Sequence, residues 1–425
     1  MSQNSMHSVC FKTKVVKAQH MKHHDWMRAK HFLAGHHPHG PAAFHARKGR
    51  HHHEMPSSGD ASKTVTVMDA GMSFSLVVGV TYLATVGVGS PATDYQLLID
   101  TGSSNTWVSA VDKPFKSTST CQDTRKTFNI SYGKGTCSGN EYMDCVTLGP
   151  GLVIEKQLIG VADNATDMDG MDGILGIGPV DLTTGTMGSS DECIPTVTDN
   201  LVKQKTIPSA CIGICYEPTT TDEPANGCLS FGGPDSSKQV SHSSSRALCS
   251  RDHRYTGDLD YVPITKKSPA SNYWGIEQSV SYGGQEIMAK CSGISDTGTT
   301  LCMLPSSVFK AYQKMTGAIL DKTTDLLTVT EDQYNSMQSM MFKIGGVEYE
   351  LTKNAQIWPR CMNNTLGADP SKIYLIFADM GEIDVGDGLC FINGFTFLQR
   401  FYSVYDTAKQ QVGFATTQYT TATTN

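Results

Sequence analysis

The sequence predicts a mainly β protein built from two similar lobes. Short runs rich in Val, Ile, Tyr and Thr, separated by Gly, Ser, Pro and Asn, follow one another from residue 73 to the end of the chain. Such runs are typical of β-strands joined by turns. Each half also contains the same two signals in the same order: an apolar run ending in Asp-Thr-Gly-Ser/Thr, and later a glycine closely preceded by apolar residues. An internal duplication explains this repeat.

The individual elements follow from local patterns. Residues 75–100 (SLVVGVTYLATVGVGSPATDYQLLID) predict successive strands with a turn at Gly-Ser-Pro. Residues 305–315 (PSSVFKAYQKM) predict a helix, because a proline stands in the first turn and apolar residues recur at helical spacing. The lobe boundary is expected near residues 254–261, which gives an N-terminal lobe at 73–256 and a C-terminal lobe at 257–425.

The first 72 residues form a basic, histidine-rich segment, called the arm below. It carries 10 Lys/Arg and 4 Asp/Glu, a net charge of +6, whereas the remainder carries 24 and 37, a net charge of −13. Twelve of the 14 histidines lie between residues 7 and 53. Such an arm either binds nucleic acid or docks on its own acidic body. Apart from a short helix at residues 27–37 (MRAKHFLAGHH), we expect no regular structure in the arm.

Several classes of protein are excluded by what the sequence lacks. No apolar run reaches the roughly 18 residues that cross a bilayer, so no membrane-spanning segment is expected. The histidine clusters of the arm have neither an HExxH pattern nor the spacing of a Cys/His finger, so we expect no dedicated metal site. The 13 cysteines include no CxxC pair, and their disulfide pairing does not follow from the sequence.

Three Asn-x-Ser/Thr sequons, at Asn129, Asn164 and Asn363, are candidate N-glycosylation sites. They fit passage through a secretory pathway. The first thirty residues contain no apolar stretch of the kind found in signal peptides, so we expect the N-terminus to be incomplete. The expected location is extracellular, with a vacuole as the alternative.

The aspartates of the repeated motif, Asp100 and Asp296, are the candidate catalytic pair. Two carboxylates a few ångströms apart do not both ionise readily, so they share a proton. The ionised partner can deprotonate a bound water while the other protonates a leaving nitrogen. The glycine after each Asp-Thr permits a tight turn whose amides point at the carboxylate. The motif therefore predicts peptide-bond hydrolysis in acid.

Rival hydrolytic chemistries fail because the body of the chain supplies almost no histidine. After residue 72 the histidines are His242 and His253, both within residues 239–254. A Ser-His-Asp triad, a Cys-His pair and a His-ligated zinc site each need one. We therefore expect the thiols to be structural, and we expect no cofactor.

From about residue 72 to the C-terminus the sequence resembles the pepsin-like aspartic endopeptidases. The strings that carry the resemblance are VGVGSPATDYQLLIDTGSSNTWV, SYGKGTCSG, GILGIGPVDLT, IPTVTDNL, YWGI, DTGTTL, AQIWPR and FINGFTFLQRFYSVYDT. The resemblance implies a bilobal fold with lobes related by a pseudo-two-fold axis. It also implies a monomer that cleaves proteins internally, preferably between hydrophobic residues.

The resemblance implies roles around the catalytic pair. The residues that follow the two aspartates are expected to hold them in position: Thr101, Gly102, Ser103, Thr297, Gly298 and Thr299. Among these, Ser103 and Thr299 hydrogen-bond the outer carboxylate oxygens, and Thr101 and Thr297 join the lobes. Two further glycines, Gly176 and Gly394, close the loops beside the aspartates.

A flap hairpin and apolar subsite walls are implied in the same way. Tyr132 closes over the substrate and leans on Trp107, while Gly133 and Gly135 permit the hairpin tip. The expected subsite walls are Leu98, Met171, Ile174 and Ile294; ordinary core packing is the alternative for these four.

Three features depart from the family pattern. Cys137 in the flap is expected to expose the site to oxidation. Asn393 stands where an apolar residue usually precedes the glycine, which puts local packing in question. Residues 239–254 (QVSHSSSRALCSRDHR) interrupt a continuous family pattern and form either an exposed loop or an artefact of the gene assembly.

The resemblance also implies that the arm is a propeptide that lies across the cleft, and we expect it to inhibit the enzyme until acid releases it. Acid neutralises body carboxylates and charges the arm histidines, which weakens the attraction between arm and body; cleavage is then expected near residues 67–72. The lysine that contacts the catalytic pair is not identified by the sequence. The expected partners are protein and peptide substrates, not nucleic acid or membrane. The alternative function is a catalytically inactive binding protein with the same fold.

Overall fold

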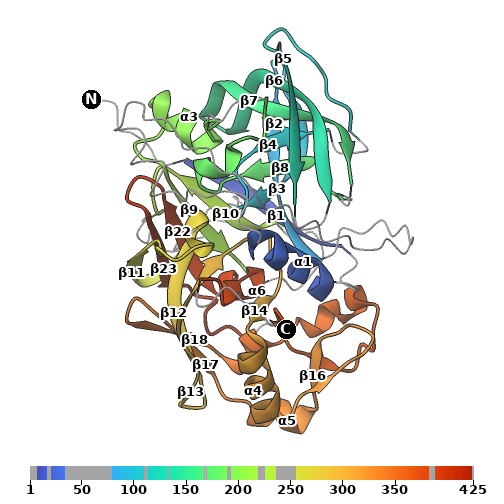
Figure 1. The fold of residues 1–425 in the computed structure, drawn as a ribbon, viewed down its shortest axis with the longest axis vertical. Coiled ribbons are helices and arrows are strands. Elements are labelled where there is room, and N and C mark those ends of the chain that lie inside the picture. The colour runs from blue at the N-terminus through green and yellow to red at the C-terminus, as the bar shows by residue number, and fades with distance from the viewer. Residues whose placement is uncertain are drawn as a thin grey trace, which may run out of the picture.

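The computed structural model describes residues 7–16, 21–33, 79–109, 113–132, 135–166, 168, 170–188, 193–218, 225–235, 255–381 and 388–423. The fold is mainly β and has two lobes, as predicted (Figure 1). The predicted insertion at 239–254 and the expected cleavage region at 67–72 lie outside these residues. Within them, no helix has the length and apolar character needed to cross a membrane.

The strands and helices up to residue 235 are β1 (His7–Val16), α1 (Met21–Leu33), β2 (Gly79–Val88), β3 (Thr93–Asp100), β4 (Thr106–Val108), β5 (Gln122–Ser131), β6 (Thr136–Gly149), β7 (Leu152–Ala165), β8 (Gly173–Gly176), α3 (Val197–Lys203), β9 (Cys211–Tyr216) and β10 (Ala225–Phe231). Those after it are β11 (Thr256–Pro263), β12 (Gly275–Tyr282), β13 (Gln285–Ser295), β14 (Cys302–Leu304), α4 (Ser306–Thr316), β15 (Ile319–Leu320), β16 (Leu327–Val329), α5 (Glu331–Ser336), β17 (Met340–Ile344), β18 (Val347–Leu351), β19 (Ile373–Tyr374), β20 (Phe377–Asp379), β21 (Phe391–Asn393), α6 (Phe395–Leu398), β22 (Phe401–Asp406) and β23 (Gln411–Thr416).

Two predicted elements appear where the local patterns placed them. The strands predicted at 75–100 include β2 and β3, which pair antiparallel around the Gly-Ser-Pro turn. The helix predicted at 305–315 is α4, which begins one residue later because Pro305 is its N-cap. Gly317 ends this helix with φ at +69°, a left-handed conformation that suits glycine.

The duplication predicted from the sequence is present in the strand pairing. In the first lobe β3 pairs parallel with β8, β8 antiparallel with β4, and β4 parallel with β7. In the second lobe β13 pairs parallel with β21, β21 antiparallel with β14, and β14 parallel with β20. In each lobe, the strand before the aspartate and the strand after it therefore belong to the same arrangement of four strands.

The lobes share a sheet, so they are not separate along the sequence. Among the described strands, the largest sheet runs β11-β23-β22-β9-β10-β1-β2-β3-β8-β4-β7-β6-β5. Strands β22 and β23 come from the end of the chain, yet β22 pairs with β9 of the first half. The second lobe has its own sheet, ordered β18-β17-β12-β13-β21-β14-β20. The large sheet therefore joins the end of the chain to the first lobe.

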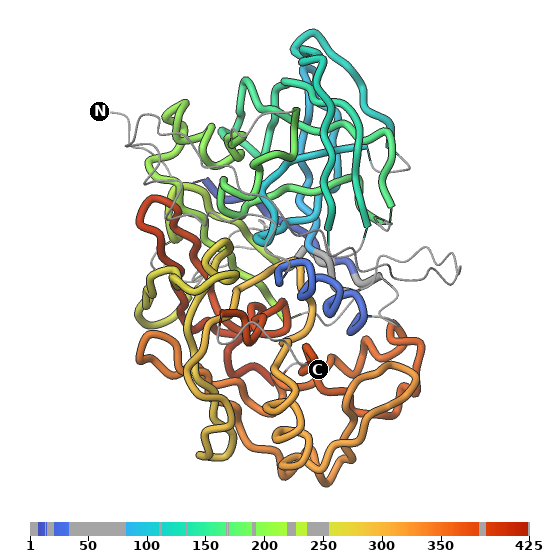
Figure 2. The backbone as a smooth tube through the Cα atoms, viewed as in Figure 1, coloured from blue at the N-terminus to red at the C-terminus, as the bar shows by residue number. Residues whose placement is uncertain are grey.

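The arm is more ordered than its composition suggests. Its strand β1 lies between β10 and β2 in the large sheet and pairs antiparallel with both. Its helix α1 lies between the two lobes (Figures 1 and 2). The short helix expected at residues 27–37 is confirmed over residues 27–33, as part of α1, which begins earlier, at Met21. The expectation of no other regular structure is wrong for β1, because pairing with β10 and β2 satisfies its backbone hydrogen bonds.

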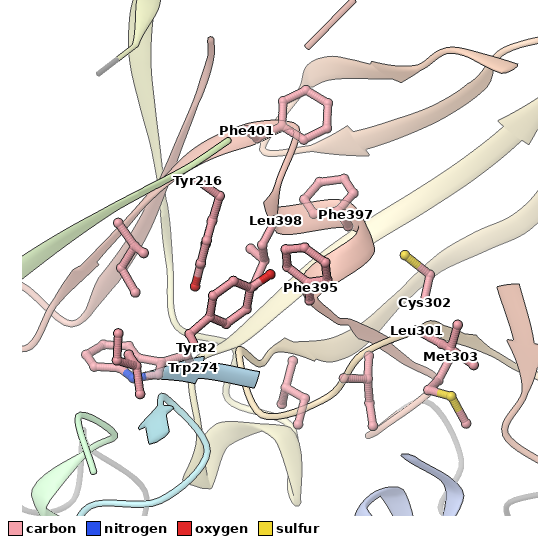
Figure 3. Packing of buried hydrophobic residues seen from close by; sticks show 14 of the residues in the cluster. Tyr82, Tyr216, Trp274, Leu301, Cys302, Met303, Phe395, Phe397, Leu398 and Phe401 are labelled. Carbon is pink, nitrogen blue, oxygen red and sulfur yellow. The ribbon is translucent and has the colours of Figure 1, made fainter. Parts of the chain in front are cut away.

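Aromatic side chains fill the core where the lobes meet (Figure 3). The ring of Tyr82 lies 4.6 Å from that of Tyr216 and 4.7 Å from that of Phe395, measured between centroids. Phe11 of the arm adds two edge-on contacts, each at 5.4 Å, to Tyr82 and Tyr216. The arm therefore contributes to the hydrophobic core.

Asn393, which departs from the family pattern, pairs with a second side-chain amide. Its side chain is buried, and its Nδ2 donates to Gln278 Oε1 at 2.8 Å. Gln278 Nε2 donates back to Asn393 Oδ1 at 3.2 Å. The backbone carbonyl of Asn393 accepts from the Asp296 amide at 3.1 Å. The buried polar groups satisfy each other, which removes the cost of an amide in the core.

Breaking this amide pair should destabilise the second lobe. Gln278→Ala leaves the buried Asn393 amide unpaired and is expected to lower the free energy of unfolding by about 2–4 kcal/mol. Leucine at both positions removes both polar groups and is expected to restore most of the loss. Urea unfolding at neutral pH measures both effects, and equal stability of the wild type and Gln278→Ala would contradict the pairing.

Candidate active site

The two repeated aspartates meet where the lobes join. Asp100 is the last residue of β3 and pairs in register with Gly176 of β8. Asp296 follows β13, and both aspartates are fully buried. A side chain at Gly176 would lie 2.5 Å from the backbone of Ser104, and one at Gly394 would lie 2.3 Å from the carbonyl oxygen of Leu301. Only glycine lets these loops pass so close behind the aspartates.

Each carboxylate accepts hydrogen bonds from the residues that follow it. Ser103 Oγ donates to Asp100 Oδ2 at 2.6 Å, and the Gly102 amide donates to Oδ1 at 2.9 Å. In the second lobe Thr299 Oγ1 donates to Asp296 Oδ2 at 2.5 Å, and the Gly298 amide donates to Oδ1 at 3.2 Å. The two Asp-Thr-Gly-Ser/Thr turns thus supply the same donors from two sides.

The threonines of the two motifs hold the lobes together beneath the carboxylates. Thr297 Oγ1 accepts from the Thr101 amide at 3.0 Å, and Thr101 Oγ1 accepts from the Thr297 amide at 2.9 Å. The Thr297 hydroxyl also donates to the Ile99 carbonyl at 2.9 Å. Both threonines are buried. These reciprocal bonds keep the carboxylates at a fixed separation.

A guanidinium from the arm lies between the carboxylates. Arg28 Nη2 donates to Asp100 Oδ1 at 2.5 Å and to Asp296 Oδ1 at 2.9 Å, and its Nε donates to Asp296 Oδ2 at 2.6 Å. One nitrogen therefore reaches both acids. The sequence resemblance led us to expect a lysine here; the contact is made by an arginine, whose planar fork suits two carboxylates.

The guanidinium changes the ionisation of the site. Burial disfavours the charged form of Asp296, but attraction to Arg28 and the hydrogen bonds from Arg28, Thr299 and Gly298 outweigh it, so its pKa is lowered. Burial opposes the charge of Arg28, yet the two carboxylates hold the Arg28 pKa above its ordinary value. Asp296 is therefore stabilised as a carboxylate while the arm is bound.

The helix that carries Arg28 docks through one stripe. Its buried residues, Met21, Asp25, Arg28, Ala29 and Phe32, recur at helical spacing. Asp25 accepts from the amides of Thr300 at 3.1 Å and Leu301 at 2.8 Å. Because two of these residues are charged, a search for apolar residues at helical spacing does not find the stripe. A search that also counted charged residues at helical spacing could have found it.

The helix also places an aromatic ring in the cleft. Phe32 is buried, and its ring meets Tyr273 edge-on with centroids 4.7 Å apart. A side chain at Gly102 would lie 3.0 Å from this ring. Sequence reasoning did not identify either aromatic residue as part of the site.

The predicted flap is the β5–β6 hairpin. Its Tyr132 amide donates to the Gly135 carbonyl at 3.0 Å, and Gly135 has φ at +87°. Trp107 Nε1 donates to Tyr132 Oη at 2.7 Å. Burial raises the Tyr132 pKa, so the phenol stays protonated. Gly133 lies outside the described residues.

The expected subsite residues fall into two groups. Ile174 belongs to a buried cluster with Trp107 and Tyr132, and Leu98 and Met171 pack against it. We call this the flap cluster; its buried members are Trp107, Phe128, Ile130, Tyr132, Cys137, Ala162, Met168, Ile174, Met187 and Ile194. Ile294 instead lies in the main core. The structure therefore brings three of the four together beneath the flap.

Cys137 is not the oxidation risk that its place in the flap suggested. Its side chain is fully buried in the flap cluster. Burial raises the pKa of its thiol to about 12. Because the thiolate is the reactive form, a buried thiol with a high pKa is protected.

The three sequons differ in exposure. Asn129 and Asn164 are exposed on strands β5 and β7. Asn363 is only 1% exposed, and its Nδ2 donates to the carbonyls of Pro370 at 3.0 Å and Lys372 at 2.7 Å. A glycan on that nitrogen would break both bonds and have no route to solvent. The structure contradicts Asn363 as a glycosylation site in this fold.

No metal site accompanies the acids in the described part of the chain, where no group of three or more His, Cys, Asp and Glu side chains is placed to hold an ion. What the site offers is two buried carboxylates on matching turns from two halves of a duplicated β fold. This combination defines an aspartic protease.

Comparisons with known proteins agree, and the chain belongs to the eukaryotic aspartyl protease family, which it matches over residues 81–417. It is 52% identical to polyporopepsin of Irpex lacteus over 348 residues, covering 81% of this chain and 97% of that protein. It is 27% identical to pepsin-3 of Oryctolagus cuniculus, covering 79% and 80%. A crystal structure of an aspartic proteinase from Irpex lacteus matches with a TM-score of 0.75, covering 81% of this chain and 96% of that one. The chain is therefore an aspartic endopeptidase.

Removing one supporting hydroxyl should alter the ionisation of the active site. Thr299→Val deletes the donor to Asp296 Oδ2, so the pKa of this carboxylate should rise and the acid limb of the pH–rate profile should move to higher pH, by up to about one unit. The matched control is Thr106→Val, because the buried Thr106 hydroxyl has no hydrogen-bond partner. Initial rates of peptide hydrolysis by the mature enzyme across the acid range measure the shift. An identical profile for Thr299→Val and the control would contradict the role of Thr299.

Proposed function

We propose that the chain is the precursor of a secreted, monomeric acid endopeptidase in which Asp100 and Asp296 activate one water for attack on a peptide bond. The observation that carries this proposal is the approach of both carboxylates to a single nitrogen of Arg28. A site that fits one guanidinium nitrogen between two acids has room for a water of similar size. The exposed sequons at Asn129 and Asn164 support the secretory route.

The proposed reaction uses the acids in different protonation states. With the arm removed, the buried pair lacks the positive charge of Arg28, and one carboxyl keeps a proton. The ionised acid removes a proton from water as the oxygen attacks the carbonyl carbon of the substrate. The protonated acid donates its proton to the carbonyl oxygen, which gives a tetrahedral intermediate. As the C–N bond breaks, the acid that took a proton from water passes it to the departing nitrogen, and the other acid takes its proton back from the intermediate. The donors from Ser103 and Thr299 hold the outer oxygens in place.

We assign substrate preference to hydrophobic residues on both sides of the bond that is cut. On the side of the flap, the half-buried Leu98 and Met171 lie against the flap cluster. On the other side, the contact of Phe32 with Tyr273 supports a place for an aromatic side chain. Burying such side chains in the cleft favours binding by about 1.5–3 kcal/mol each.

We further propose that the arm is an intramolecular inhibitor. Its guanidinium takes the position proposed for water and the scissile carbonyl, and Asp25 holds the helix to the second lobe. The lowered pKa of Asp296 sets the direction of the pH effect. A depressed carboxyl pKa stabilises the bound arm above the ordinary pKa of an aspartate, and this stabilisation is lost as the pH falls through the lowered value. Acid therefore releases the arm.

Loss of one carboxylate should abolish catalysis. Asp100→Asn removes an acid that must change protonation state, so hydrolysis of casein at acid pH should fall by at least about 10²–10⁴-fold. Asp94→Asn makes the same change at an exposed position of the same strand and should leave the rate unchanged. The rate of peptide release, measured with purified mature protein, tests both. Casein hydrolysis that survives Asp100→Asn would exclude the mechanism.

Replacing the arginine should loosen the inhibited state. Arg28→Met removes the charge that lowers the Asp296 pKa, so the precursor should begin to hydrolyse a short peptide and to mature at higher pH than the wild type. Lys30→Met is the control, because Lys30 lies on the same helix with its ammonium over the Trp26 ring, 3.4 Å from the centroid. Peptide hydrolysis and gel mobility are followed from neutral to acid pH. The same onset for wild type and Arg28→Met would argue against the arm as the inhibitor.

A further inference from the structure

Two of the three sequons occupy one outward row of the flap sheet. In the pairing of β5 with β6, Asn129 lies opposite Ser138, and in the pairing of β6 with β7, Ser138 lies opposite Asn164. Directly paired residues point to the same face of a sheet. Asn129 and Asn164 are both exposed, so their amides leave the same outer face two strands apart, about 10 Å from each other.

The next row of the same strands faces the opposite way. Ile130 lies opposite Cys137, and Cys137 opposite Ala165. Ile130 and Cys137 are buried members of the flap cluster, and Ala165 packs against it. Because successive residues of a strand point to opposite faces, the Asn129–Ser138–Asn164 row lies on the back of the layer that contacts Tyr132 and Trp107.

We propose that Asn129 and Asn164 both carry N-linked glycans, and that this pair forms a hydrophilic shield on the outer face of the flap that selects substrates by size. A glycan is bulky and strongly hydrated, so the face that bears it stays open to solvent and is closed to the surface of another folded protein. The inner face keeps its contacts. An extended peptide needs only the space beneath Tyr132, whereas a folded protein is large enough to meet the glycans on the outer face.

The proposal rests on the proposed secretion and proteolysis, but its first readout is independent of activity. The full-length chain is produced by a secreting eukaryotic host, and its intact mass is measured before and after treatment with a peptide N-glycosidase. Asn129→Gln and Asn164→Gln should each remove the mass of one glycan, and Asn363→Gln should remove none. A protein with neither glycan, with only one of the two, or with a glycan at Asn363 overturns the proposal.

The second readout tests the shield itself. The mature wild type and the Asn129→Gln/Asn164→Gln variant are compared on a short peptide, on an unfolded protein and on the same protein in its folded state. Loss of both glycans should raise kcat/KM several-fold for the folded protein and leave it unchanged for the peptide. Equal changes for all three substrates, or no change for any of them, contradict size selection. Failure of the proposed function looks different, because every form would then lack activity.

Discussion

Two carboxylates buried at the same point are the constraint on which the rest of this structure depends. Each would lose the solvation of its charge, and each repels the other. The chain offsets both costs with donors fixed in the backbone turns after Asp100 and Asp296, and with hydroxyls at Ser103 and Thr299. Those donors work only if the two halves stay together, which the reciprocal bonds of Thr101 and Thr297 and the shared sheet ensure.

In this structure, the arm offsets the remaining cost of burying the two carboxylates. Arg28 brings a positive charge into the site, and β1 anchors the segment before it between β10 and β2. The same carboxylates therefore have two uses under our proposal: they hold the inhibitor when both are ionised, and they act on water when they share a proton. When the pH falls, one carboxylate of the pair gains a proton. Under the proposal, this single protonation both releases the arm and prepares the pair for catalysis.

The sequence predicted features that depend on local or repeated patterns, and it did not predict contacts between residues far apart in the chain. The strands at 75–100, the duplication and the acids are local or repeated signals, and each reappears in the structure. Asp25 and Arg28 were missed because they are charged residues in a buried stripe, and their partners lie more than 70 positions away. The pairing of β22 with β9 was not predicted for a similar reason, since β22 returns from the end of the chain to reach β9.

Expectations for single residues failed where the outcome depends on whether the side chain is buried and on what it contacts. Asn363 carries a correct sequon but is enclosed by the fold, and Cys137 lies in the flap yet faces its buried side. Asn393 looked like a packing defect until Gln278, more than 100 positions away, supplied the matching amide. A sequence pattern does not contain these pairings, because they depend on which side of a strand faces the core.

The dependence of kcat/KM on pH, measured for the mature enzyme with a short uncharged peptide, tests the central claim most directly. Two acids that share one proton predict a bell-shaped profile in which both limbs lie on the acid side of neutrality. A profile that rises through a single ionisation and stays level into alkaline solution would contradict it, because catalysis would then need only one ionised group.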